Sequence, residues 1–137
     1  MKALLAAALL IGATQAQAVS VETASGDWGQ VPKLKFRGDT LNNAVVEKIH
    51  SLIEKGTCVI PGQSKKKIDM AVPFLVHYGK DGAADRLVIA KLGCAEAEGV
   101  IGGALATLVD QGAYQATGEN PGGWYRHQVS FSYNNAL

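Results

Sequence analysis

The sequence predicts an α+β fold: a three-stranded antiparallel sheet with two helices packed on one face. The first observation is the stretch from Lys67 to Leu92, where two strand-like segments are joined by a glycine-bounded turn. The second is a pair of segments with apolar residues at helical spacing, one on each side of that hairpin. The third is a last strand-like segment with one apolar face. The order helix, strand, strand, helix, strand suits an antiparallel sheet with both helices on the same side.

The first eighteen residues are typical of a secretory signal peptide. Lys2 provides a short basic start, Ala3 to Ala13 is apolar, and Ala16-Gln17-Ala18 is a small-residue cleavage site. The apolar run is too short for a spanning helix, which needs about 20 apolar residues. We therefore expect a periplasmic or secreted product with no membrane span once residues 1–18 are removed.

The charge of the chain is balanced. It carries 13 Lys and Arg against 12 Asp and Glu, and removal of Lys2 with the signal leaves the two signs equal. A neutral domain lacks the electrostatic footprint of a nucleic-acid or anionic-lipid binder, so neither partner is expected. The one basic run, Lys65-Lys66-Lys67, is interpreted as a solvated loop before a strand, with a partner-facing patch as the alternative.

Residues 19–39 are predicted to form an irregular N-terminal arm, and residues 40–137 a single α+β domain. The arm is rich in Gly, Ser, Thr and Asp and contains Pro32, which are turn and loop residues. Lys33 to Phe36 alternates lysines with apolar residues, so a brief strand pairing is expected there. The length of the domain is enough for one hydrophobic core and too short for two.

The first helix is predicted to follow Thr40, a good N-cap residue, and to end before Gly56 as a C′ residue. His50 lies within it and is interpreted as a structural histidine, at the surface or half-buried. The apolar stripe at helical spacing consists of Leu41, Ala44, Val45, Ile49, Leu52 and Ile53.

The hairpin is predicted from strict alternation in its first strand. Apolar residues occupy every second position there, and Gly79-Lys80-Asp81-Gly82 contains the Asp-Gly pair typical of tight turns. Pro73 lacks a backbone donor, so it should face an unpaired side or a bulge. The alternating residues are Ile68, Met70, Val72, Phe74, Val76 and Tyr78.

The second helix is predicted over Ala95 to Gln111, with Gly112 as its stop. Each glycine inside a helix weakens it by about 1 kcal/mol relative to alanine, so three internal glycines indicate a close approach to the sheet. A loop is expected from Tyr114 to Gly123, and a one-sided strand from Trp124 to Tyr133. The helix glycines are Gly99, Gly102 and Gly103.

Two cysteines in an exported chain favour a disulfide. Cys58 follows the first helix and Cys94 follows the second hairpin strand, so we predict a Cys58–Cys94 bridge. The alternatives are two buried free thiols or a pair of metal ligands. The chain has no C-x-x-C or paired-His spacing that would favour the latter.

No catalytic constellation stands out, so a non-enzymatic protein without metal or cofactor is expected. There is no serine elbow, no H-E-x-x-H and no P-loop. One minority hypothesis is a metal or acid/base site made by His77 and His127 together with Asp69 or Asp85. Polar faces of small sheets carry such residues routinely.

Several segments together resemble the C-terminal domain of TonB-like energy transducers. They are Phe74-Leu75-Val76-His77-Tyr78-Gly79-Lys80-Asp81-Gly82, Gly93-Cys94, the alanine-rich helix, and the final strand at Trp124 to Phe131. The resemblance covers roughly Leu41 to Tyr133. The chain departs from that family because its signal is cleavable, its four prolines form no repeat, and Gln115 or Ala116 stands where a proline is usual.

The resemblance implies a sheet that binds an extended segment of a protein partner by strand addition. That partner would be an outer-membrane receptor or another envelope protein, with a link to transmembrane transport. The implied edge is the four-residue stretch Gln128, Val129, Ser130 and Phe131. Two alternatives remain open: the edge is covered by the chain's own arm, Val19 to Phe36, or by a second copy in a homodimer, because long bare edges are a liability.

Overall fold

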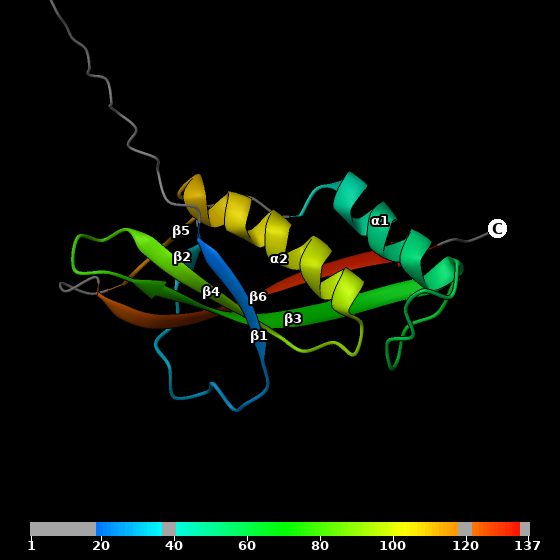
Figure 1. The fold of residues 1–137 in the computed structure, drawn as a ribbon, viewed down its shortest axis with the longest axis horizontal. Helices are drawn as coiled ribbons and strands as arrows, with labels where there is room; N and C mark the ends of the chain where they lie inside the picture. The colour runs from blue at the N-terminus through cyan, green and yellow to red at the C-terminus, as the bar shows by residue number, and fades with distance from the viewer. Residues whose placement is uncertain (1–18, 37–40, 118–121, 135–137) are drawn as a thin grey trace, which may run out of the picture.

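The computed structural model of the protein describes residues 19–36, 41–117 and 122–134 (Figure 1). The expected signal peptide and the expected N-cap at Thr40 lie outside these residues. Within the described ranges, two α-helices and six β-strands follow in the order β1 (Ser20–Ala24), β2 (Lys35–Phe36), α1 (Asn43–Glu54), β3 (Lys67–Tyr78), β4 (Ala84–Ala90), α2 (Ala95–Asp110), β5 (Tyr114–Gln115) and β6 (Gly123–Asn134).

The α+β class with two helices is confirmed, but the sheet is larger and mixed. It has four strands in the order β1-β4-β3-β6, and β1 runs parallel to β4 while the other pairs are antiparallel. The predicted three-stranded antiparallel sheet is therefore wrong in strand number and in direction at one edge. A separate small sheet pairs β2 with β5, and β5 lies at the start of the segment from Tyr114 to Gly123, where a loop was expected.

The hairpin forms as its alternation predicts. Even-numbered residues of β3 are buried against the helices and odd-numbered ones face the other side. Gly82 adopts a positive φ of 82° in the turn, and the Asp81 carboxylate accepts the backbone N–H of Ala83. Pairing of β3 with β4 begins at Phe74↔Ile89, so Pro73 stands where β4 leaves the side of β3, as its missing donor requires.

Both helices cover the same face of the sheet (Figure 1). The N-cap of α1 is Asn42, whose side-chain oxygen accepts the N–H of Val45. Gly56 and Gly112 follow the two helices with φ of 78° and 79°, the left-handed conformation of a C′ residue. The core between helices and sheet contains the largest fully buried side chains, Phe74, Ile49, Ile68, Leu87, Ile89, Ile101, Leu105, Val72 and Val76.

Close approach of α2 to the sheet occurs at one of its three glycines. A Cβ at Gly102 would lie 2.8 Å from Cγ1 of Val21 in β1 and 3.8 Å from Cδ1 of Ile89 in β4. At Gly99 and Gly103 an added Cβ would have no atom within 4 Å beyond the adjoining residues and the backbone of the helix itself. The packing explanation therefore holds for Gly102 alone.

Residues 19–36 contain two strands and pair with other strands, in the segment where an irregular arm was expected. It begins as edge strand β1, and its next loop passes on the side of the sheet away from the helices (Figure 1). Lys33 then bridges to Arg126 of β6, and β2 pairs with β5. The brief pairing expected at Lys33 to Phe36 is confirmed. β1 escaped prediction because its five residues show no apolar alternation.

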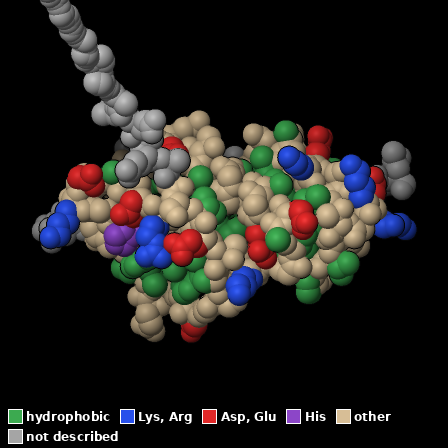
Figure 2. Space-filling view, viewed as in Figure 1, with side chains coloured by type: hydrophobic (Ala, Val, Ile, Leu, Met, Phe, Trp, Pro, Cys, Tyr) green, Lys and Arg blue, Asp and Glu red, His purple; other side chains and the backbone are tan. Residues whose placement is uncertain are grey.

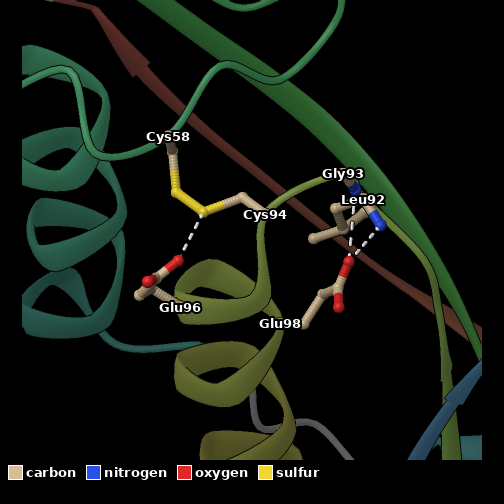
Figure 3. Close-up of a disulfide and its surroundings, with 6 residues drawn as sticks. All are labelled: Cys58, Leu92, Gly93, Cys94, Glu96 and Glu98. Carbon is tan, nitrogen blue, oxygen red and sulfur yellow. Dashed lines mark hydrogen bonds between the residues drawn. A yellow bond between two sulfur atoms is a disulfide. The ribbon is translucent and has the colours of Figure 1, made fainter.

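The predicted Cys58–Cys94 disulfide is present (Figure 3). It joins the loop after α1 to the N-cap position of α2, and both cysteines are buried. At the same helix end, the Glu98 carboxylate accepts the backbone N–H groups of Leu92 and Gly93 at 2.7 and 3.2 Å (Figure 3). The bridge thus ties both helices together, and Glu98 holds the turn that precedes α2, whose N-cap residue Cys94 makes no side-chain cap hydrogen bond. In the described part of the chain, no helix is long and apolar enough to span a membrane.

Candidate functional site at the outer edge of β6

β6 is a long edge strand that pairs along its whole length with one neighbour, β3. It pairs with β3 from Gly123↔Tyr78 to Asn134↔Lys67, without a register shift. Tyr125 and Val129 are buried on the helix side of the sheet, which anchors the strand further. A strand fixed in this way offers its other edge as a rigid template.

Two backbone hydrogen bonds show which residues of β6 direct their N–H and C=O groups away from β3. The N–H of Arg126 donates to the carbonyl of Pro32 at 2.8 Å, and its carbonyl accepts the N–H of Leu34 at 2.9 Å. Backbone groups in an antiparallel strand alternate between its two neighbours. Gln128, Ser130 and Ser132 therefore direct their backbone groups away from β3, as Arg126 does.

Among the residues that the structure describes, the outer edge is covered only at its beginning. The arm pairs with it at Arg126 and then turns into β2. At Gln128, the backbone N–H donates to Nδ1 of the neighbouring His127 at 2.8 Å. From Gln128 to Asn134 no other strand in the described ranges lies beside β6.

The stretch of β3 that does not pair with β4 has its outward backbone groups bonded by residues of the preceding loop. Beyond Pro73, where β4 no longer accompanies β3, the side chain of Gln63 takes the place of a neighbouring strand. Its Oε1 accepts the N–H of Asp69 at 2.7 Å, and its Nε2 donates to the carbonyl of Asp69 at 3.1 Å. Closer to the strand start, Ser64 donates its N–H to the carbonyl of Lys67. This edge is thus closed by side chains and a turn, a common protection against unwanted pairing.

All four residues of the predicted edge lie on β6, but they divide into two kinds. Gln128 and Ser130 direct their backbone groups outward, whereas those of Val129 and Phe131 point to β3. The side chains of Val129 and Phe131 lie on the helix side, where Val129 is buried and Phe131 half-buried. The sequence pattern shows two faces but gives no sign of which backbone groups are outward.

The histidines of the minority hypothesis lie on opposite faces of the sheet. Nδ1 of His77 lies 2.7 Å from Oδ1 of Asp85 on the side away from the helices. The ring of His127 instead contacts Phe74 and Tyr114 on the helix side, with centroid distances of 5.9 and 5.3 Å. The structure therefore does not bring His77 and His127 together as a metal or acid/base pair.

The remaining polar groups around His77 form a surface network. Nε of Arg86 donates to the Glu22 carboxylate at 2.9 Å, and the guanidinium lies 4.9 Å from the Trp124 ring centroid. Ion pairs at such exposed positions contribute little to stability. Charged side chains of both signs are interspersed over the face shown in Figure 2, in keeping with the neutral composition.

Among the described residues, one group of potential metal ligands has its donor atoms close together: Cys58, Cys94 and Glu96. The two sulfurs are joined to each other, so neither is a thiolate available to a metal. His50 is buried in α1, with its ring stacked on Tyr133 and its Nε2 2.6 Å from the Lys65 carbonyl. The surface or half-buried position expected for His50 is therefore wrong, because the residue is buried.

A cleft lies between the hairpin turn and the end of α2, with a volume of about 880 Å³. Tyr78 lines it and donates its hydroxyl to the carbonyl of Tyr114. Burial, and secondarily the neighbouring Tyr125, raises the pKa of Tyr78 to about 12. A phenol with that pKa stays protonated at neutral pH and is a poor general base. Tyr78 is therefore not a candidate general base in this cleft.

Comparison of the chain with family models, with curated proteins and with solved structures found no match.

Proposed function

We propose that this protein is a non-catalytic, exported binding module that takes up an extended segment of a protein partner along the outer edge of β6. The observation that carries the proposal is the contrast between the free stretch of β3 and the outer edge of β6, the longer of the two terminal strands of the sheet. Gln63 and Pro73 close the edge of β3, while the edge of β6 is left without a strand from Gln128 onward. Main-chain hydrogen bonds to an added strand would satisfy the outward groups of β6.

The sequence resemblance to the TonB C-terminal domain supports the same proposal. That family's fold implies strand addition at the last strand, and here the last strand is an edge strand. In its described part, residues 19–36, the arm pairs with that edge at Arg126, upstream of Gln128. The partner is thus proposed to be an outer-membrane or other envelope protein, met in the periplasm or outside the cell and linked to outer-membrane transport.

A proline at Ser130 tests the proposal. Proline removes the outward donor of Ser130 and places its ring in the path of an added strand, while the bonds from β6 to β3 use the other residues. We expect Ser130→Pro to lose at least about tenfold in affinity for a captured envelope partner. Ser130→Ala is the matched control because it keeps the backbone donor and should bind as the parent does.

Val129→Pro provides the opposite comparison. Its donor points to β3, so the substitution breaks the sheet itself and should lower the melting temperature. If Ser130→Pro stays folded and binds the partner with full affinity, strand addition at this edge is wrong.

The second candidate is a homodimer formed through the same edge. Around a twofold axis at Ser130, Gln128 of one copy would face Ser132 of the other, and none of these side chains carries a charge that would oppose pairing. Light scattering separates the two. A monomer at high concentration excludes the dimer, and a tight dimer abolished by Ser130→Pro argues against free peptide capture.

A further inference from the structure

The open edge of β6 ends at a pocket on the side of the sheet away from the helices. The pocket has a volume of about 600 Å³, and its lining includes Trp28, Pro73 and Gln128 together with the basic residues Lys33 and Arg126. Pro73 and Gln128 are directly opposite each other in the β3–β6 register. The pocket thus lies beside the first residue of β6 that the arm leaves uncovered.

An added strand cannot continue past this point. Both backbone groups of Arg126 are already used by Pro32 and Leu34. Arg126 is fixed further because its Nε donates to the carbonyl of Val31 at 2.7 Å. A segment that pairs with Ser132 and Ser130 must therefore end, or turn away, beside Gln128.

The charge of the pocket distinguishes the two directions in which a strand can be added. Lys33 and Arg126 line it with two positive charges against the one negative charge of Asp27, which accepts the backbone N–H of Gly29, so the net charge of the lining is positive. A strand antiparallel to β6 would place its carboxyl end here, and a parallel strand its amino end. A terminal carboxylate is attracted by the two basic side chains, whereas a terminal ammonium is repelled.

The pocket also favours a particular last side chain. A residue paired opposite Gln128 would point to the same face as Gln128 does, because side chains of neighbouring strands are in register. The indole of Trp28 and the ring of Pro73 line that face. A large apolar or aromatic side chain would bury surface there.

We propose that the β6 edge binds the carboxyl-terminal segment of its protein partner in antiparallel orientation. The terminal carboxylate lies beside Lys33 and Arg126, and the last side chain, apolar or aromatic, lies against Trp28. This inference rests on the proposed function, since it specifies which kind of segment the edge accepts. Capture of a chain terminus beside a strand edge uses known modes of peptide recognition.

Synthetic peptides test the inference directly. Heptapeptides of alternating threonine and valine, ending in phenylalanine or in serine, are prepared with a free carboxylate and as carboxamides, and their binding is measured by fluorescence polarisation. We expect the free acid ending in phenylalanine to bind about tenfold more tightly than its amide, because a charge-assisted contact is lost. It should also bind more tightly than the acid ending in serine.

Variants of the protein assign the effect to the pocket. Lys33→Gln should remove most of the difference between acid and amide, while Lys35→Gln should keep it. Lys35 is exposed on the same arm, does not line the pocket, and loses the same charge. Trp28→Ala should remove the preference for phenylalanine, and the melting temperature shows whether its loop remains ordered. Lys33 is exposed, so its variant decides the matter even if Trp28→Ala unfolds.

The outcomes distinguish recognition of the carboxyl terminus from strand addition at the β6 edge, the function on which it rests. If acids and amides bind equally, and Ser130→Pro abolishes both, strand addition stands and terminal recognition is wrong. If the Lys33 and Lys35 variants lose the acid preference equally, the pocket is not the carboxylate site. If no peptide binds, both proposals fail.

Discussion

Two neighbouring glycines of α2 provide a sharp test of the fourth strand. Gly103 is exposed and a Cβ there meets no other atom within 4 Å. Gly103→Ala should therefore stabilise the protein by about 1 kcal/mol, the difference in helix propensity. Gly102 gains the same propensity on replacement, but its Cβ would lie 2.8 Å from Cγ1 of Val21 in β1.

That distance is about 1 Å shorter than an ordinary carbon–carbon contact. Overpacking of this kind costs roughly 1–3 kcal/mol. Gly102→Ala should thus range from neutral to about 2 kcal/mol destabilising, and it should fall below Gly103→Ala by about 1–3 kcal/mol. The free energy of unfolding from urea titration of the two variants measures this gap.

Val21→Ala identifies the cause of the gap. It removes the clashing methyl group, so the combination with Gly102→Ala should recover at least about 1 kcal/mol relative to the sum of the single changes. The reasoning is refuted if Gly102→Ala stabilises as much as Gly103→Ala. In that case β1 would not lie beneath α2.

Three further predictions concern the disulfide, a tyrosine and the closed edge. Replacing Cys58 and Cys94 together by alanine should cost about 4 kcal/mol, since the bridge closes a loop of 36 residues; a shift below about 1 kcal/mol in urea unfolding would contradict this. The pKa of Tyr78 is raised from 10.0 to about 12 in the folded protein, so the folded state favours the protonated phenol. The contribution of Tyr78 to the free energy of unfolding is therefore complete below pH 10 and is lost as the pH rises toward 12. Between about pH 9 and about pH 12, the free energy of unfolding of the parent should fall by up to about 2 kcal/mol more than that of Tyr78→Phe, as urea titrations at each pH measure. Gln63→Ala should uncover the backbone of Asp69 and raise its amide hydrogen-exchange rate, whereas Gln63→Glu, which keeps one acceptor, should preserve protection of the N–H.

The parts of the fold that follow from local chemistry could be predicted from the sequence. The alternation of β3 and the positive-φ glycines after each helix are properties of short windows. The Cys58–Cys94 pairing also followed, because only two cysteines are present and both flank predicted elements. The N-cap differs because Asn42, two residues after Thr40, offers its side chain to the N–H of Val45.

The parts that were missed depend on contacts between distant segments. β1 pairs with β4 across more than sixty positions of the chain, and its exposed residues show no apolar period. The bridge from Lys33 to Arg126 is likewise non-local. Period-2 patterns report which face of a strand is buried, and they contain no information on what lies at its edges.

The edges are where the function is proposed, and they explain why the arm matters. A sheet with uncovered edge stretches risks pairing with any extended chain. Here Gln63 closes the free stretch of β3, and the arm closes the start of β6 at Arg126, while no other described strand lies beside β6 beyond Gln128. An edge shortened in this way admits only a few residues, with the arm as a fixed end stop. Selectivity then depends less on the backbone, which is alike in all chains, than on what the pocket at that stop accepts.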